Sequence, residues 1–221
     1  MNRAQTLSTP NNKNFPYYSK IKRLQEELSN KVVARDCFTK PIRHVCGVDV
    51  SYRNDIGYCS AVILRKVTGE VLESVNVKCK VNYPYIPGLF LLREYEPILD
   101  ALNMLSEEYD LLLIDGHGQL HPTKCGLACN IGITVSKPTI GVAKSLLCGT
   151  IKDDCSIELD DQILGRVVEK ISGKPVYVSV GHKISLKSAA KLVGKLIAHG
   201  QHIPQPLLVA HINSKKLASE R

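Results

Sequence analysis

Apolar residues recur along the chain with two different periods, and the change of period divides the first part of it into elements. Over residues 18–33, apolar positions three or four residues apart predict an amphipathic helix. Three mainly apolar segments then follow, and they predict strands over 44–52, 58–67 and 70–81. Because the connections between these strands are short and polar, we expect them to form an antiparallel meander.

Beyond the meander, helical and strand patterns alternate. A helix is expected over 89–108, and the apolar run 111–114 is typical of a strand buried on both faces. The further expected elements are a helix over 125–133, a strand over 139–143, a β-excursion within 150–174, a strand over 176–180, and a helix over 186–199 capped by Ser185 and stopped by Gly200. This order predicts an α/β fold (an α+β mixed sheet) of five or more strands flanked by helices, as in ribonuclease H-like proteins.

Length and composition bound the class of protein. A chain of 221 residues with 44% apolar residues is long enough for one domain with a full core, which we place at 15–221 after a polar, disordered tail over 1–14. No apolar run approaches the roughly 20 residues that span a bilayer, and the N-terminus lacks the apolar core of a signal peptide. We therefore expect no membrane association and an intracellular location, cytoplasmic and/or nuclear.

The eight cysteines and the distribution of charge refine this picture. No cysteine pair has CxxC spacing, so free thiols in a reducing compartment are expected, and the C-x3-C pair of Cys125 and Cys129 is a weak zinc signal. Residues 1–35 carry a net charge of +5 and residues 183–221 of +6, whereas the middle of the chain carries −3. Basic ends around an acidic centre suit a cation-binding core with phosphate-attracting surfaces, although solubility alone would also explain them.

Three acidic residues occupy unusual positions for a packed fold. Asp49 lies within the first expected strand, Asp115 directly follows the buried strand 111–114, and Glu94 begins the long helix. Each alone has an ordinary explanation as a turn or capping residue. Together they favour a divalent cation, because a buried carboxylate needs a partner and oxygen ligands suit Mg²⁺ or Mn²⁺.

The loop that follows the expected strand 111–114 carries further candidate functional residues. Asp115-Gly116-His117-Gly118 is followed by His121, so backbone and imidazole groups lie at the carboxyl end of a buried strand. The H-x3-H spacing would suit zinc only on a helix, and the glycines oppose a helix here. For each of the two histidines, the alternative to a functional role is a purely structural one.

Lysines supply candidate phosphate contacts. Lys144 ends the strand 139–143, where it can reach a phosphate or remain an ordinary surface lysine. A basic stripe recurs every four residues along the last expected helix and its approach, and a solvated face explains it equally well. The stripe comprises Lys183, Lys187, Lys191 and Lys195.

Taken in order, several short motifs resemble the endonuclease V family over about residues 20–213. They are Gly47-Val48-Asp49-Val50-Ser51, Pro84-Tyr85-Ile86-Pro87-Gly88 with Arg93-Glu94, Asp115-Gly116-His117-Gly118 with His121-Pro122, Gly126-Leu127-Ala128, Gly141-Val142-Ala143-Lys144 and Gly181-His182-Lys183-Ile184-Ser185. The ordered set is specific, although each piece alone is weak.

The resemblance implies a ribonuclease H-like fold and Mg²⁺-dependent hydrolysis, with Mn²⁺ as a substitute, of the second phosphodiester 3′ to inosine or deoxyinosine. The products would be a 3′-hydroxyl and a 5′-phosphate. Asp49, Glu94 and Asp115 would bind metal, and His121 and Lys144 would act at the phosphate or its attacking water. Pro84, Tyr85, Ile86 and Pro87 would form a strand-separating wedge, and the base pocket would comprise Gly88, Phe90, Gly116, Gly118, Gly126, Leu127 and Leu147.

The motifs leave the sugar of the substrate open. The segment 175–182 is most similar to animal members, which act chiefly on inosine in RNA, whereas the wedge and the 115–118 loop are more similar to bacterial members, which act on DNA. We expect an animal-type monomer that accepts RNA and retains DNA cleavage. The alternatives are a metal-dependent nuclease with little base specificity and a ribonuclease H-like binding module without catalysis.

Overall fold

The structure is a computed structural model that describes residues 18–38, 40–83, 91–169 and 174–220. The expected disordered tail over 1–14 and the expected wedge over 84–88 lie outside these residues, as does Phe90. The meander, the alternation that follows it and the β-excursion are all present.

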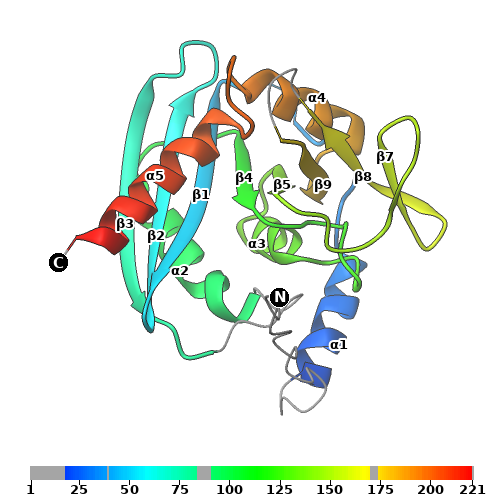
Figure 1. Ribbon diagram of the computed structural model, residues 1–221, viewed down its shortest axis with the longest axis horizontal. Helices are drawn as coiled ribbons and strands as arrows, with labels where there is room; N and C mark the ends of the chain where they lie inside the picture. The colour runs from blue at the N-terminus through cyan, green and yellow to red at the C-terminus, as the bar shows by residue number, and fades with distance from the viewer. Residues whose placement is uncertain (1–17, 39, 84–90, 170–173, 221) are drawn as a thin grey trace, which may run out of the picture.

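One sheet of nine strands runs through the molecule in the order β3-β2-β1-β4-β5-β9-β8-β7-β6 (Figure 1). β1, β4 and β5 run parallel to one another, and every other neighbouring pair is antiparallel. The mixed sheet confirms the expected fold class. The strands are β1 (His44–Arg53), β2 (Ile56–Arg65), β3 (Val71–Lys80), β4 (Leu111–Asp115), β5 (Thr139–Ala143), β6 (Thr150–Ile151), β7 (Ser156–Leu159), β8 (Gln162–Val168) and β9 (Val176–His182).

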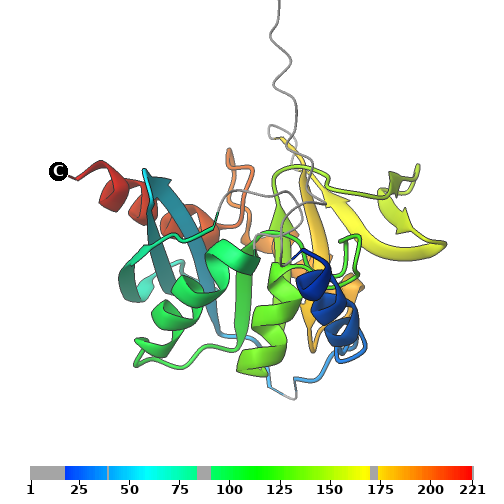
Figure 2. The same cartoon turned by 90° about the horizontal axis from the view of Figure 1, so that it is seen from below.

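Helices cover both faces of the sheet, as Figure 2 shows. α2 (Leu91–Asn103) and α3 (Leu127–Val135) pack on one face, and α4 (Leu186–Leu196) and α5 (Gln205–Ser219) pack on the other. α1 (Tyr18–Ser29) lies against α3, where Gln25 Nε2 donates to the carbonyl of Cys125 at 3.0 Å. The core is aliphatic, as the scarcity of aromatic residues predicts.

Three helices end earlier than the apolar pattern predicts, and the first of them, α1, stops at Ser29 rather than at residue 33. α2 stops at Asn103 rather than near residue 108, because the carboxylate of Glu73 accepts the backbone N–H groups of Ser106 and Glu107 and holds that segment against β3. α4 begins after the predicted cap Ser185, whose side chain accepts from Ser188 N, but it ends at Leu196. No helix among the described residues is both long and apolar enough to cross a membrane.

The pattern did not predict α5 at all. Its buried residues are Pro206, Leu207, Ala210 and Ser214, a face too small and too polar to register as an amphipathic stripe. The helix nevertheless packs closely on β1, because Gly47 has no side chain: a Cβ there would lie 2.4 Å from the carbonyl carbon of Pro206. α5 thereby brings the end of the chain across the strand that carries Asp49 (Figure 1).

Candidate active site

Neighbouring parallel strands bring the two predicted aspartates together. Val48 of β1 pairs with Ile114 of β4, so Asp49 and Asp115 occupy adjacent positions one residue further along. Asp49 is only 6% exposed, and Glu94 reaches the same place from the first turn of α2. The three acids that the sequence singled out therefore line one pocket of about 200 Å³.

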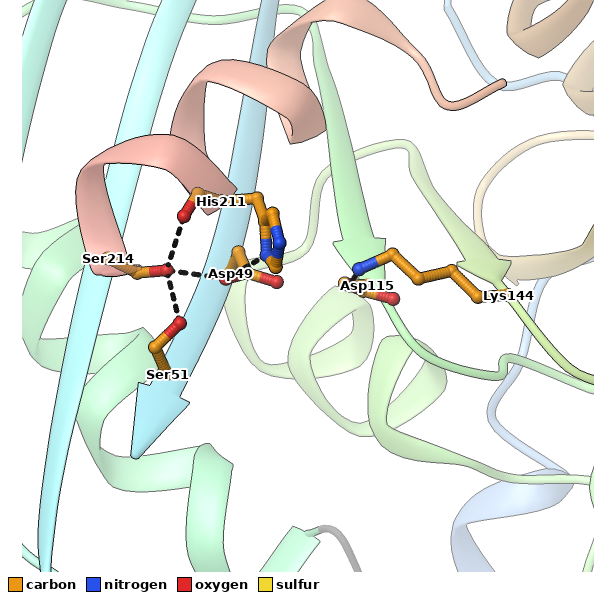
Figure 3. A network of polar contacts seen from close by, with 6 residues as sticks. All are labelled: Asp49, Ser51, Asp115, Lys144, His211 and Ser214. Atoms are coloured by element: carbon orange, nitrogen blue, oxygen red, sulfur yellow. Dashed lines mark hydrogen bonds and ion pairs between the residues drawn. The ribbon is translucent and has the colours of Figure 1, made fainter. Parts of the chain in front are cut away.

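Asp49 is held by two residues of α5. Ser214 Oγ donates to Asp49 Oδ2 at 2.6 Å, and His211 Nδ1 lies 3.2 Å from the same oxygen (Figure 3). Ser51, two residues along β1, bonds Ser214 Oγ at 2.8 Å. Since one carboxylate oxygen is occupied by these contacts, the orientation of Asp49 is fixed by α5.

Asp115 forms an ion pair across the strand ends. Lys144 Nζ at the end of β5 lies 2.5 Å from Asp115 Oδ2, and the two residues lie on the opposite side of Asp49 from Ser214 (Figure 3). Burial raises the pKa of Asp115, Lys144 opposes that rise and Asp49 adds to it, so that the pKa reaches about 6. The site thus holds more negative charge than its one lysine compensates.

Glu94 is the most strongly perturbed acid. Burial raises its pKa to about 8, with repulsion from Asp115 and Asp49 adding to the rise, while the hydrogen bond from Tyr52 opposes it. Tyr52 OH donates to Glu94 Oε1 at 3.0 Å, and the guanidinium of Arg93 lies 4.3 Å from the Tyr52 ring centre. Adjacent acids whose pKa values are raised mark a site suited to a cation.

The chemistry of these donors fits a hard divalent cation, since three carboxylates supply the oxygen ligands that Mg²⁺ and Mn²⁺ prefer. Over the described residues, no three His, Cys, Asp or Glu side chains already stand at metal-binding distances from a common point. Each acid instead contacts a protein partner: Asp115 pairs with Lys144, Asp49 accepts from Ser214, and Glu94 accepts from Tyr52.

His117, rather than the predicted His121, lines the acid pocket. One ring nitrogen, Nε2, lies 3.1 Å from the carbonyl of Ser145, and burial lowers the pKa of the imidazole to about 4. His121 is also buried, and its Nδ1 lies 2.8 Å from Thr123 Oγ1. The contact with Thr123 orients the imidazole within its own loop, and the action of His121 at the phosphate stays a prediction.

The glycines of the predicted base pocket divide into two groups. A Cβ on Gly118 would lie 2.0 Å from the carbonyl oxygen of Val180, and one on Gly126 would lie 2.3 Å from that of His117. Gly118 is therefore required where the loop packs on β9, and Gly126 where the chain before α3 packs on the loop. Gly116 lines the acid pocket and has room, because the nearest atom to its Cβ position is 3.6 Å away on Leu127.

Other predicted residues lie away from the acids. Leu147 is 37% exposed and is not among the residues that line the acid pocket. Lys183 does not belong to the basic stripe: its ammonium donates to the carbonyl and hydroxyl oxygens of Ser136 at 2.8 and 2.6 Å. The remaining stripe of Lys187, Lys191 and Lys195 is exposed on α4.

Sequence reasoning missed the residues that hold the acids in place, namely Tyr52, His211 and Ser214. For His211 and Ser214, the sequence offers one weak signal: the segment 205–219 contains a single histidine and no acidic residue. This pattern is too common to single out a site.

Comparison with known proteins adds an independent line of evidence to this geometry. The model of one family, endonuclease V, matches residues 26–212. The chain belongs to the endonuclease V family. An endonuclease V of Dictyoglomus thermophilum is 40% identical over 207 residues, which cover 90% of this chain and 90% of that protein.

Solved endonuclease V structures share the fold. That of the Streptomyces avermitilis protein has a TM-score of 0.82 at 30% identity, covering 90% of this chain and 92% of that chain. The Ciona intestinalis endonuclease V, solved with a 24mer DNA containing an inosine followed by a ribo-adenosine, has a TM-score of 0.79 at 26% identity and covers 90% and 96%. The endonuclease V described here is accordingly an enzyme, a nuclease that cleaves phosphodiester bonds.

Proposed function

We propose that this endonuclease V hydrolyses the second phosphodiester 3′ to inosine or deoxyinosine, in a reaction that depends on Mg²⁺ or Mn²⁺. The observation that carries the proposal is the convergence of Asp49, Glu94 and Asp115, from β1, α2 and β4, on one pocket that Lys144 also lines. A buried set of acids with one cation suits phosphate chemistry far better than it suits packing.

The three acids would hold the divalent cation, which when bound stabilises the negative charge that develops on the phosphate. The residues around them set their positions. Ser214 and His211 fix Asp49, and Tyr52 fixes Glu94, so that their carboxylates keep one orientation when substrate enters.

Lys144 has the role of a phosphate contact. Its side chain is 42% exposed and its ammonium reaches Asp115 from the end of β5, so Lys144 lies at the mouth of the pocket. A phosphate oxygen can share this ammonium with Asp115, which orients the phosphate toward the acids. His117, kept neutral by burial, lines the pocket without adding charge.

Base selection rests on the resemblance to the family. Pro84, Tyr85, Ile86 and Pro87 would separate the strands, and Gly88, Phe90, Gly116, Gly118, Gly126, Leu127 and Leu147 would surround the extruded base. The inosine-containing DNA bound by the Ciona protein supports this choice of base. A pocket closed against the C2 edge of the base would exclude guanine, which carries an amine there.

The substrate strand is RNA, with DNA also accepted, and the protein acts as a monomer. Support for the strand comes from the animal-like segment 175–182 and from the mixed DNA and ribo-adenosine oligonucleotide in the Ciona complex. All eight cysteines lie among the residues that the structure describes, and all are free thiols. Free thiols support an intracellular location, cytoplasmic and/or nuclear.

Paired cleavage assays test the proposal. Matched single strands of RNA and of DNA, with and without one inosine or deoxyinosine, are incubated with the enzyme in Mg²⁺ and in a chelator. We expect one cut, at the second phosphodiester 3′ to the modified base, only with metal. Equal cutting of the unmodified strands would identify a nuclease without base specificity, and binding without any cutting would identify a binding module.

A further inference from the structure

A second hollow opens beside the acids, on the opposite side of Asp49 from Asp115 and Lys144. Its volume is about 810 Å³, and it runs between the end of β1 and the exposed side of α5. We name it the α5 groove. Tyr52 and Arg53 line it from β1, and His211, Ile212, Lys215 and Lys216 line it from α5.

The α5 groove adjoins the active site. Two of its lining residues contact the acids directly, since His211 approaches Asp49 at 3.2 Å and Tyr52 donates to Glu94 at 3.0 Å. A strand whose phosphate reaches the acids would pass over His211 and Tyr52 to enter the groove. Figure 3 shows Ser214 and Ser51 of α5 and β1 on one side of Asp49, the ion pair of Asp115 with Lys144 on the other, and His211 next to Asp49 itself.

The charge of the groove suits a phosphate backbone. Arg53, Lys215 and Lys216 line it, and none of the lining residues is acidic. Lys215 and Lys216 are exposed, and over the described part of the chain neither forms an ion pair. Arg53 is fixed in place, because its Nη1 donates to the carbonyls of Ala218 and Glu220 at the end of α5.

One apolar side chain completes the surface. Ile212 is 56% exposed in the lining of the groove, where it can contact a sugar ring. From His211 to Ser219, α5 rises about 12 Å, at about 1.5 Å per residue. That length matches about three nucleotides of a stacked strand at about 3.4 Å each.

We infer that the α5 groove binds the backbone of the substrate strand on the 3′ side of the scissile phosphodiester. The inference rests on the proposed function, in which the inosine lies 5′ to the cut. The pocket-lining Gly116 and its loop lie on the Asp115 side of Asp49, so the strand that leaves the acids in the 3′ direction faces Lys215 and Lys216.

Substrates of graded 3′ length test this inference. Inosine-containing single strands with one, two, four or eight nucleotides beyond the cut are compared for the wild-type enzyme and for Lys215→Ala/Lys216→Ala. Each phosphate contact to a single strand changes the logarithm of the binding constant by about 0.7 per tenfold change in salt. Two contacts therefore raise the binding constant at 0.1 M salt by about 25-fold relative to 1 M salt. We expect wild-type kcat/KM to rise by about that factor and to level off near four nucleotides.

The double variant should lose this rise and should match the wild-type enzyme on the shortest substrate. Its binding of the longest strand, measured by anisotropy in Ca²⁺, should show a salt slope lower by about 1.4. Lys40→Ala/Lys66→Ala is the matched control, because it removes the same charge where β1 begins and β2 ends, at the far end of the meander. This control should keep both the rise and the slope.

The possible failures are distinguishable. A wild-type enzyme that cuts inosine strands while the Lys215→Ala/Lys216→Ala variant keeps the full length dependence would overturn the assignment of the groove alone. An equal loss on every length, or the same loss in the control pair, would also overturn it. No cutting of any inosine strand by the wild-type enzyme would overturn the proposed function, and the inference with it.

Discussion

Asp49 is positioned by residues from the opposite end of the chain. Its Oδ2 accepts from Ser214 and approaches His211, and both lie more than 160 residues away in sequence. The acid itself was predictable, because a carboxylate between two valines of a buried strand has few structural uses. Its partners were not, because their proximity depends on where α5 packs.

His211→Ala should reduce cleavage without unfolding the protein. The side chain is 27% exposed, so little packing is lost, but Asp49 loses a contact that orients it. Removing such an outer partner of a metal-binding acid typically costs about 10- to 100-fold in activity or metal affinity. The check is single-turnover cleavage at several Mg²⁺ concentrations, alongside thermal unfolding.

His199→Ala is the matched control for that variant, since His199 is exposed beyond the end of α4. Its cleavage rate should equal that of the wild-type enzyme. A His211→Ala enzyme that is equally active at low Mg²⁺ would separate His211 from the positioning of Asp49.

At the scale of elements, the strands were predictable and the ends of the helices were not. Strong apolar runs such as 111–114 fix a strand whatever surrounds them. The ends of α2 and α4 depend instead on contacts distant in sequence, such as the carboxylate of Glu73 that accepts from Ser106 and Glu107. The weakly amphipathic α5 exists because it packs on β1 over Gly47, a tertiary effect that no local pattern reports.

Asp36 links the segment before β1 to the start of α4, and its contribution should depend on pH. It accepts from Ser185 N at 2.7 Å and from Ser188 Oγ at 2.7 Å. Partial burial acts to raise the pKa of Asp36, but these hydrogen bonds outweigh it and hold the pKa below its usual value of 3.8.

Asp36→Asn should therefore lower the free energy of unfolding at pH 7 by about 0.5 kcal/mol, a small value because water screens an exposed carboxylate. A carboxyl group whose pKa is lower in the folded protein stabilises the fold at pH values above its pKa in the unfolded chain. This stabilisation is lost as the pH falls through the pKa of the folded state. Urea unfolding from pH 7 to pH 2.5 should show the difference shrinking below pH 4. The exposed Asp153→Asn variant should show no such trend, and a difference independent of pH would argue against the charge of Asp36 as its source.

At the scale of the whole molecule, the net charge of +8 says less than its placement. The pattern along the chain singled out the stripe of Lys183, Lys187, Lys191 and Lys195, and it did not point to Lys215 or Lys216. In the structure, the ammonium of Lys183 donates to Ser136. The helix α4 starts beyond His182, and His182 pairs with Thr139, the first residue of β5. The start of α4 therefore lies at the end of the sheet away from Asp115. Among the described lysines near the C-terminus, Lys215 and Lys216 are the two that line the groove beside the acids.

The stripe of Lys187, Lys191 and Lys195 should raise affinity without setting base preference, since phosphate contacts carry no base information. Changing all three to Ala should weaken binding of inosine and unmodified single strands alike and lower the salt slope by about 2. Anisotropy titrations from 50 to 300 mM salt give this slope. An unchanged slope would identify the stripe as a solvated face of α4.

The central claim is that Asp49, Glu94 and Asp115 hold the divalent cation on which inosine-directed cleavage depends. Asp115→Asn tests it most directly, because the side chain keeps its volume and loses the charge that a hard cation requires. Lys144 then loses its ion pair, but its ammonium remains in the pocket as the proposed phosphate contact.

The deciding measurement is single-turnover cleavage of an inosine-containing strand across a Mg²⁺ and Mn²⁺ titration, with binding of the same strand followed separately in Ca²⁺. The account predicts that Asp115→Asn cleaves at least about a hundredfold more slowly, equivalent to about 2.7 kcal/mol of barrier, while the folded variant still distinguishes inosine from unmodified strands in binding. Near-normal cleavage by the folded Asp115→Asn enzyme at low Mg²⁺ would contradict the assignment of the metal site.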